Sequence, residues 1–460
     1  MSDEISLGEL TCAETLEPRL VAAGLDGPAA AEKVKRFDRA ARTLIERGLT
    51  AATPARAFFV PGRIEVLGKH TDYCGGRSML SVVERGFHVV IVRRTDPVVR
   101  MTDVSLGETI DFAVDHELQP ELGQWSNYPM TAARRVARDF ADSLVGCEIA
   151  FGSDLPAAAG MSSSSALIVA TFLALSAVNR LDQRERYRQN ISNREDLASY
   201  LGTIENGESF GSLAGDKGVG TFGGSEDHTA MLCSQPRAIR QYAYCPIRFE
   251  RTLALPDDWM FGIASSGIAA EKTGEAREKY NLASRLASGA AELWRKETGR
   301  DDIHLAAAIE SSDGAADRML NILKQSRHTE FSPQQLVDRV QHFYNENYQI
   351  IPAAGDALAE GNTKRFGKLV DQSQEFTDTL LHNQVPETIF LANSARAVGA
   401  VAASAFGAGF GGSVWALFRS ADAASMLDEW SQRYARQYPD HADKSVFFLT
   451  GAGPAAFQIR

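Results

Sequence analysis

The spacing of hydrophobic residues differs between the two halves of the chain. In the first half, apolar residues at helical spacing over residues 29–49 predict an amphipathic helix that ends at Gly48. Short β-branched segments between 55 and 114, separated by turn residues, predict an antiparallel sheet. The stretch 165–181 is apolar on all sides, which indicates a helix that is buried in a core and too short to span a membrane.

The second half is dominated by helical patterns. It follows a Gly- and Ser-rich stretch at 205–230, which is typical of a surface loop. The expected elements are helices at 275–297, 332–351 and 385–399, and two strands on either side of a glycine-rich turn within 400–418. The pattern therefore predicts a mixed α+β chain with two domains, residues 1–230 and residues 231–460.

Charge and cysteine content limit the classes of partner and the cellular location that we expect for this protein. The formal net charge of −11 argues against a general binder of nucleic acids or of anionic membranes, because both attract basic proteins. The five cysteines are scattered without a C-x-x-C pair, which is typical of reduced thiols. The N-terminal residues are acidic and lack a secretory pattern, and no run of about 18 apolar residues occurs. We therefore expect a soluble cytoplasmic protein whose partners are small molecules.

One loop has the features of a phosphate-binding site. After a predicted strand, Gly160 is followed by Met161, then by the four serines 162–165 and by the buried helix. A helix N-terminus presents unpaired N–H groups and a positive dipole end to an anion, and small residues let the backbone approach phosphates closely. A serine-rich helix cap that binds no ligand would have the same sequence. The loop is not a Walker A motif, because G-x-x-x-x-G-K-[ST] is absent.

Three glycine-rich segments together resemble a known family. "PGRIEVLGKHTDYCGG" (61–76), "LPAAAGMSSSSA" (155–166) and "SAFGAGFGGSVWAL" (404–417) have the order and approximate spacing of the three motifs of GHMP kinases. The first resembles the galactokinase signature, and "WSNY" (125–128) and "EKYN" (278–281) also resemble galactokinases. The resemblance implies the GHMP kinase fold, with an N-terminal α/β domain, a C-terminal ferredoxin-like domain and the active site in the cleft. It also implies ATP-dependent phosphorylation of the anomeric hydroxyl of galactose or a related sugar.

The resemblance assigns roles to individual residues. Asp227 would orient the sugar hydroxyl or accept its proton, and Arg63 would keep Asp227 ionised and stabilise the transferred phosphoryl group. Mg²⁺ would be bound by Ser164 and Glu205, with Glu208 as the alternative to Glu205. The sugar would be bound by Lys69, His70, Asp72, Tyr73 and Tyr280. ATP would be bound by Ala158, Gly160, Met161, Ser162, Ser163, Ser164, Ser165, Gly409, Gly411 and Trp125.

Two departures from the galactokinase signature leave the substrate open. Lys69 replaces the usual glutamate, and Glu65 replaces the usual asparagine. A lysine facing the far end of the sugar would favour a carboxylate there, as in a uronic acid. In the alternative, Lys69 pairs with Glu65 and the substrate is unchanged. A non-catalytic sensor of sugar and ATP is a third possibility, which the presence of Asp227, Arg63 and the serine run argues against.

Overall fold

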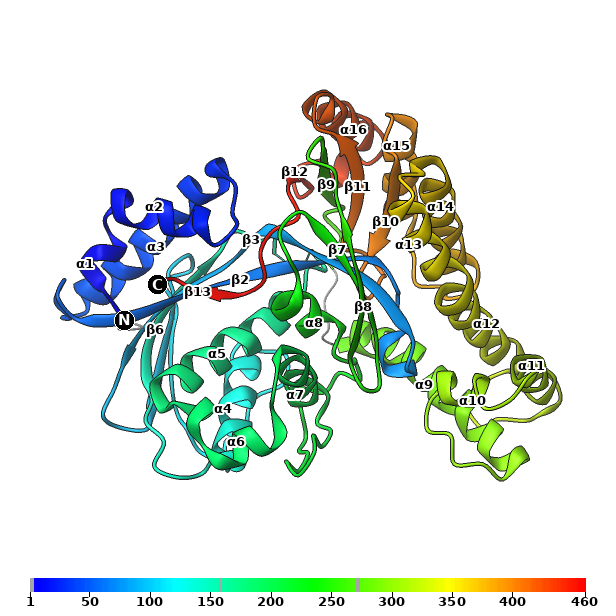
Figure 1. The fold of residues 1–460 in the computed structure, drawn as a ribbon, viewed down its shortest axis with the longest axis horizontal. Coiled ribbons are helices and arrows are strands. Elements are labelled where there is room, and N and C mark those ends of the chain that lie inside the picture. The colour runs from blue at the N-terminus through cyan, green and yellow to red at the C-terminus, as the bar shows by residue number, and fades with distance from the viewer. Residues whose placement is uncertain (1–3, 158, 270–273) are drawn as a thin grey trace.

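The computed structural model describes residues 4–157, 159–269 and 274–460. Within this part of the chain, nine strands form one sheet and four strands form a second (Figure 1). The first sheet has the order β1-β2-β3-β6-β4-β5, with β13 on β2 and the β7–β8 hairpin on β3. Its strands are β1 (Ile5–Ser6), β2 (Pro54–Leu67), β3 (Arg77–Arg93), β4 (Val98–Asp103), β5 (Thr109–Ala113), β6 (Cys147–Ser153), β7 (Ala238–Ala243), β8 (Arg248–Ala254) and β13 (Phe457–Gln458).

Both faces of the first sheet are buried. Successive side chains of a strand point to opposite faces, so Phe58 and Val60 of β2 pack in one core while Ala57 and Phe59 pack in another. Helix α5 packs on β2 and β3 from one side, and helix α3 packs on β3 and β6 from the other (Figure 1). The helices of this half are α1 (Leu7–Leu10), α2 (Ala13–Ala22), α3 (Gly27–Glu46), α4 (Asn127–Asp139), α5 (Ser163–Asn179), α6 (Glu185–Asn190), α7 (Arg194–Asn206) and α8 (Glu226–Cys233).

The second sheet has the ferredoxin-like arrangement expected for the C-terminal domain. It is antiparallel throughout, and its order is β10-β11-β9-β12. Helices join β9 to β10 and β11 to β12, which gives the split β-α-β pattern. The elements are β9 (Trp259–Ser265), α13 (Ile351–Ala359), α14 (Thr363–Thr379), α15 (Pro386–Ala397), β10 (Ala402–Phe406), β11 (Ser413–Arg419), α16 (Ala423–Gln437), α17 (Pro439–Ala442) and β12 (Val446–Thr450).

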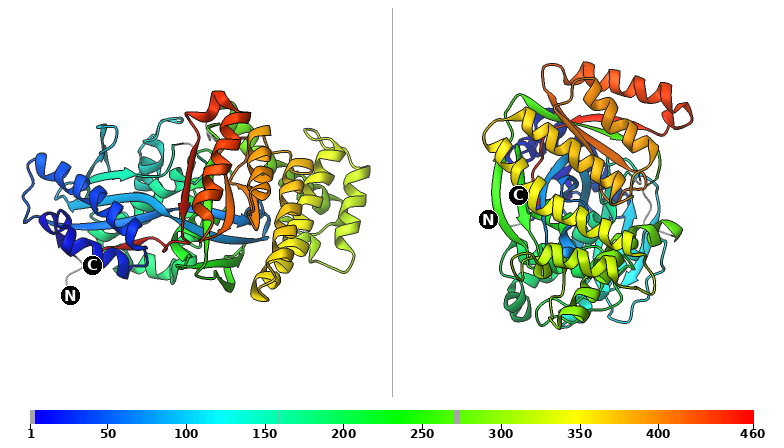
Figure 2. Two further views of the ribbon diagram at one scale, coloured as in Figure 1. Left: turned by 90° about the horizontal axis from the view of Figure 1, so that it is seen from above. Right: turned by 90° about the vertical axis from the view of Figure 1, so that its right-hand side faces the viewer.

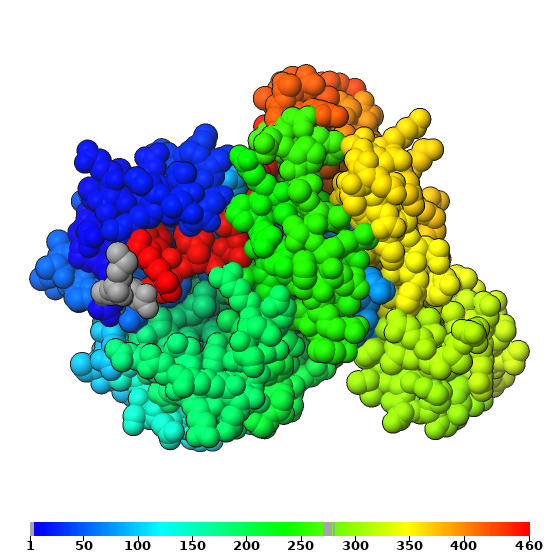
Figure 3. Space-filling view, in the orientation of Figure 1, coloured from blue at the N-terminus to red at the C-terminus, as the bar shows by residue number. Residues whose placement is uncertain are grey.

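A helical extension separates β9 from the rest of the second domain. It contains α9 (Gly274–Thr298), α10 (Leu305–Ile309), α11 (Ala315–Gln325), α12 (Pro333–Tyr344) and the π-helical turn η3 (Asn345–Ile350). The extension has its own apolar core and lies at one end of the molecule (Figure 2). In the space-filling view it stands beside the segment around residue 250, apart from the N-terminal helices (Figure 3).

The main elements expected from the sequence are present. The uniformly apolar stretch forms α5, whose residues pack almost entirely in the core, and the glycine-rich turn within 400–418 connects β10 to β11. Strands β7, β8 and β13 come after residue 230 and nevertheless belong to the first sheet, so the chain crosses between the two sheets more than once. None of the described helices is long and apolar enough to cross a bilayer.

Candidate active site

A cavity of about 650 Å³ lies where the three glycine-rich segments meet. Arg63 and His70 come from the first segment, Gly160 and the serines 162–164 from the second, and Gly407 and Ala408 from the third. Arg63 and Gly160 are 97 positions apart and His70 and Ala408 are 338 apart. Strands β2 and β3, helix α5 and the β10–β11 turn bring these residues together. Residues of both domains therefore line the cavity.

Arg63 and Asp227 form a salt bridge on the cavity wall. Arg63 Nε donates to Asp227 Oδ1 at 2.6 Å, and Nη1 donates to the carbonyl oxygen of Gly160 at 2.9 Å. Arg63 is 5% exposed. Burial opposes its charge, but Asp227 and Glu65 more than offset this effect and raise the pKa of Arg63. One guanidinium thus links the sugar signature, the phosphate loop and the first turn of α8.

The four serines 162–165 lie at the start of helix α5, and the first three of them line the cavity. Ser162 has a left-handed backbone (φ 58°), and Ser163 is the first residue of α5. Ser162, Ser163 and Ser164 line the cavity. Ser165 is buried one position further and donates to Glu205 Oε2 at 2.7 Å and to Asp227 Oδ2 at 3.3 Å. Met161 packs into the core that joins the two domains, which places its side chain away from the cavity.

Glu205 and Glu208, the two candidate metal-binding glutamates, line two different cavities. Glu205, near the end of α7, lines the main cavity and also accepts a hydrogen bond from Thr221 Oγ1 at 3.4 Å. Glu208 lines a neighbouring cavity of about 700 Å³ instead. No group of three or more His, Cys, Asp or Glu side chains suited to a metal occurs in the described part of the chain. Glu205 and Ser164 offer oxygen donors in one cavity, and such a small set fits Mg²⁺, which usually takes one or two carboxylates together with substrate phosphates.

His70, Asp72 and Tyr73 form a polar part of the cavity wall. Asp72 Oδ2 accepts a hydrogen bond from the backbone N–H of Glu226 at 3.0 Å, and burial raises the pKa of Asp72. His70 Nδ1 and the Tyr73 hydroxyl are 2.9 Å apart, and His70 Nε2 lies 3.3 Å from the Ala408 carbonyl oxygen. Burial also raises the pKa of Tyr73 well above its usual range. This wall offers a carboxylate, an imidazole and a phenol to a hydroxylated ligand.

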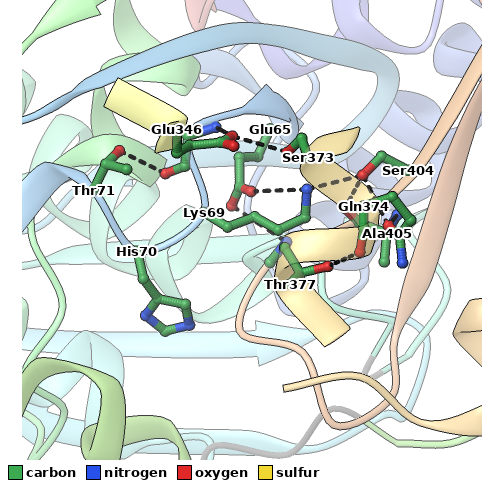
Figure 4. Close-up of polar contacts among 12 residues, drawn as sticks. Glu65, Lys69, His70, Thr71, Glu346, Ser373, Gln374, Thr377, Ser404 and Ala405 are labelled. Atoms are coloured by element: carbon green, nitrogen blue, oxygen red, sulfur yellow. Dashed lines mark hydrogen bonds and ion pairs between the residues drawn. The ribbon is translucent and has the colours of Figure 1, made fainter. Parts of the chain in front are cut away.

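The side chain of Lys69 does not reach the cavity. It is fully buried, and Figure 4 shows it pointing away from His70, toward β10. Lys69 Nζ donates to Ser404 Oγ at 2.9 Å and lies 3.9 Å from Glu65 Oε1. Lys69 is absent from the described lining, whereas Glu65 is part of it. The arrangement is therefore the alternative in which Lys69 pairs with Glu65, because the ammonium is already held by these two partners.

Part of the cavity lining is apolar. Trp125 lies there with its Nε1 donating to Glu108 Oε2 at 3.1 Å and its ring 5.7 Å from that of Phe151. The apolar lining also includes Phe87, Leu106, Tyr128, Leu155 and Leu167. An apolar slot next to a phosphate loop suits the base of a nucleotide, and this slot adjoins the serines of the second segment.

Other expected residues have different surroundings. Gly409 faces Asn383 and Gly411 faces Ile268, so within the third segment it is Gly407 and Ala408 that line the cavity. Ala158 lies outside the described residues. Tyr280 belongs to α9, but its side chain is outside the described part of the structure.

The sequence interpretation missed Glu226 as a lining residue and treated Glu65 only as a departure from the motif. Burial raises the pKa of Glu226 well above its usual range, and Glu65 adds to the effect. Glu226 is next to the aspartate that the motif identified, and that position was the only available signal. For Glu65, the signal was its place two residues after Arg63, on the same face of β2.

Comparisons with known proteins agree with this geometry. Three family models match the chain: the GHMP kinases N terminal domain at residues 127–215, the GHMP kinases C terminal domain at 356–436, and the galactokinase galactose-binding signature at 49–93. A galactokinase of Chloroflexus aggregans is 27% identical over 382 residues, which is 82% of this chain and 86% of that protein. A galactokinase of Roseiflexus sp. is 26% identical over 81% of this chain and 86% of its own length.

Solved structures show the same fold. The Lactococcus lactis galactokinase, crystallised with galactose, has a TM-score of 0.71 at 22% identity and covers 88% of this chain and 95% of its own. The L. major mevalonate kinase in complex with R-mevalonate has a TM-score of 0.52 at 15% identity and covers 86% of this chain and 96% of its own. The chain therefore contains the N- and C-terminal domains of GHMP kinases and the galactose-binding signature of galactokinases, and it has the fold of the Lactococcus lactis enzyme.

Proposed function

We propose that the protein transfers the γ-phosphoryl group of ATP to the anomeric hydroxyl of galactose or of a closely related neutral sugar. The observation that carries this proposal is the Arg63–Asp227 salt bridge, which joins the Gly160 carbonyl of the phosphate loop to the wall that holds Asp72. Phosphoryl transfer needs mainly positioning and neutralisation of spread-out negative charge. A cation and a carboxylate fixed between a phosphate loop and a polar wall supply both.

The residues divide the work by position. Asp227 is held by Arg63 and Ser165, so its carboxylate has a fixed direction from which it orients the reacting hydroxyl or accepts its proton. Arg63 stabilises the charge that develops on the transferred group. The N-terminus of α5 and its serines bind the phosphates, and the slot around Trp125 receives the base. Glu205 and Ser164 would hold Mg²⁺, which when bound neutralises charge on the phosphates.

A neutral sugar fits the cavity better than a uronic acid. At the sugar end, the described lining includes Glu65, Asp72, Glu226 and Asp227, while the guanidinium of Arg63 is already paired with Asp227. Among the described residues of the lining, a carboxylate on the sugar would face these acidic groups with no unpaired cation beside it, because the Lys69 ammonium is bound to Ser404 and Glu65. Hydroxyl groups, in contrast, donate hydrogen bonds that carboxylates accept.

The test is ATP consumption by the purified protein with Mg²⁺ and a set of sugars: galactose, arabinose, galacturonate and glucuronate. We expect turnover with galactose or arabinose and none with the two uronates. Turnover confined to a uronate would overturn the neutral-sugar assignment, and binding of sugar and ATP without turnover would indicate a sensor. The proposal includes a cytoplasmic location, which the five free thiols support.

A further inference from the structure

Glu65 is a buried carboxylate that lines the cavity and takes none of the roles described above. Glu65 is 3% exposed and lies on β2, two residues after Arg63. Alternate residues of a strand share a face, so the two side chains leave β2 in the same direction and about 6–7 Å apart. Arg63 marks the reacting end through Asp227. Glu65 therefore lies in the same cavity as Asp227, at a distance from the point of phosphoryl transfer.

The hydrogen-bonding capacity of Glu65 is only partly used. Its Oε2 accepts a long hydrogen bond from the backbone N–H of Gly407 at 3.4 Å, and the carboxyl group of Glu226 also hydrogen-bonds to the Glu65 side chain. Its Oε1 has no hydrogen-bond partner among the described residues, and its ion-pair contact is Lys69 Nζ at 3.9 Å. A carboxylate that is buried and incompletely bonded is costly unless another donor completes its shell. Glu65 is part of the cavity lining, so a ligand that fills the cavity can bring a donor to this carboxylate.

The surroundings favour the ionised form of Glu65 over that of its neighbour. Burial raises the pKa of Glu65 to about 7, while the charges of Lys69 and Arg63 act against that rise and Asp227 adds to it. Glu226 has its pKa raised well above the usual range, by burial first and then by Glu65 and Asp72. Two buried carboxyl groups that face each other do not both ionise easily, so the one beside the lysine keeps the charge.

Lys69 is anchored on the side away from the cavity. Its Nζ donates to Ser404 Oγ of β10, and Ser404 Oγ donates to Gln374 Oε1 of α14 at 2.9 Å (Figure 4). The backbone N–H of Ala405 donates to the same Gln374 oxygen at 2.8 Å. This chain fixes the ammonium against the C-terminal domain, and the ammonium in turn fixes the direction of the Glu65 carboxylate.

We propose that Glu65 is a substrate-binding residue that accepts a hydrogen bond from a sugar hydroxyl remote from the transferred phosphoryl group, and that Lys69 is the positioning residue that holds its carboxylate in place. The inference rests on the proposed function, since it names the contact by which the same site selects a hydroxylated ligand. In this arrangement Glu65 supplies the carboxylate with which the sugar signature binds the ligand. Lys69 does not contact the ligand and holds that carboxylate in place.

The experiment compares galactose with analogues that each lack one hydroxyl group, in wild-type protein and in Glu65→Gln. The amide keeps the side-chain volume and loses the charge. We expect Glu65→Gln to raise the KM for galactose by about tenfold or more, with kcat and the KM for ATP changed by less than about threefold. For the one analogue that lacks the bound hydroxyl, the ratio of mutant to wild-type KM should fall to about one. Lys69→Met should raise the KM for galactose, and should add little when combined with Glu65→Gln.

The chain offers a matched control in Glu346. This glutamate is also fully buried near Lys69, but it accepts hydrogen bonds from the Gly68 N–H at 2.9 Å and Ser373 Oγ at 3.0 Å and is not part of the described cavity lining. Glu346→Gln should lower the melting temperature without changing the KM for galactose. If Glu65→Gln does not fold, Glu65→Asp, which keeps the charge on a shorter side chain, should show a smaller rise in KM with the same dependence on the missing hydroxyl.

The outcomes separate the two proposals. A wild-type protein that phosphorylates galactose, with a Glu65→Gln variant whose KM for galactose stays within about twofold, overturns this inference alone. An equal penalty for galactose and for every analogue also overturns it, because a merely structural effect does not depend on one hydroxyl. A wild-type protein that phosphorylates no sugar overturns the proposed function and this inference together.

Discussion

Gly407 is the point where the third glycine-rich segment touches the other two, and Gly407→Ala tests that contact. Its backbone is left-handed, with φ of +85°. A Cβ placed there would lie 2.9 Å from the carbonyl oxygen of Gly160 and 3.2 Å from Arg63 Nη2. The new methyl group would therefore press on both partners of the hydrogen bond by which Arg63 holds the phosphate loop.

The size of the effect follows from these distances. Ordinary contacts of a Cβ begin near 3.4 Å, so the Gly160 oxygen or the new methyl group must move by about 0.5 Å. Misplacement of catalytic groups by about 1 Å costs roughly a hundredfold in rate, so a shift of half that size should lower kcat by about tenfold, or ~1.4 kcal/mol. The left-handed backbone adds about 1–2 kcal/mol of strain, which lowers stability.

Gly361→Ala is the control that separates strain from contact. Gly361 also has a left-handed backbone (φ +68°), but no atom lies within 4 Å of the position of its Cβ. Both variants should lower the melting temperature by similar amounts, measured by calorimetry. In steady-state kinetics with galactose and ATP, only Gly407→Ala should lose kcat. Equal kcat values for the two variants would refute the idea that Gly407 sets the position of Arg63 and Gly160.

Four further outcomes are expected. Asp227→Asn should lower kcat by about 10²–10⁴-fold while calorimetry shows galactose binding within about threefold of wild type. Trp125→Ala should raise the KM for ATP by about tenfold and leave that for galactose unchanged. Glu205→Gln should raise the Mg²⁺ concentration needed for half-maximal turnover. Because the pKa of Glu65 is raised to about 7, its carboxylate takes up a proton as the pH falls through 7; KM for galactose should rise over that range in wild type and stay flat in Glu65→Gln.

Local hydrophobic patterns predicted the elements that do not depend on contacts with distant parts of the chain. The helix α5 could be predicted because its sequence is apolar on nearly all sides and most of its residues are buried. The β10–β11 turn could be predicted because its glycines interrupt two apolar strands. The membership of β7 and β8 in the first sheet was not readable, because strand pairing between Arg77–Leu80 and Arg240–Ala243 depends on contacts about 160 positions apart. The periodicity of a strand shows which face is buried but not which strand is its neighbour.

The sequence predicted which residues lie near the site better than it predicted the directions of their side chains. Arg63, Asp72 and Asp227 lie at the cavity as the motifs imply. Lys69 does not, because β2 ends at Leu67 and the chain then turns at Gly68 (φ +114°), where a side chain would collide with Ser78. After such a turn the alternation of the strand no longer applies, so no spacing rule could give the direction of the lysine.

The two departures from the signature are best understood as one feature. Removing one partner of a buried ion pair leaves an uncompensated charge, which costs about 3–5 kcal/mol, whereas the pair together is close to neutral in stability. Glu65 without Lys69 would face Glu226 and Asp227 with less positive charge beside it. Lys69 without Glu65 would be a fully buried ammonium that donates to Ser404 Oγ. A lysine in the signature therefore does not make the pocket positive. Lys69 is buried beside Glu65 and outside the described cavity lining, and the lining itself keeps its carboxylates.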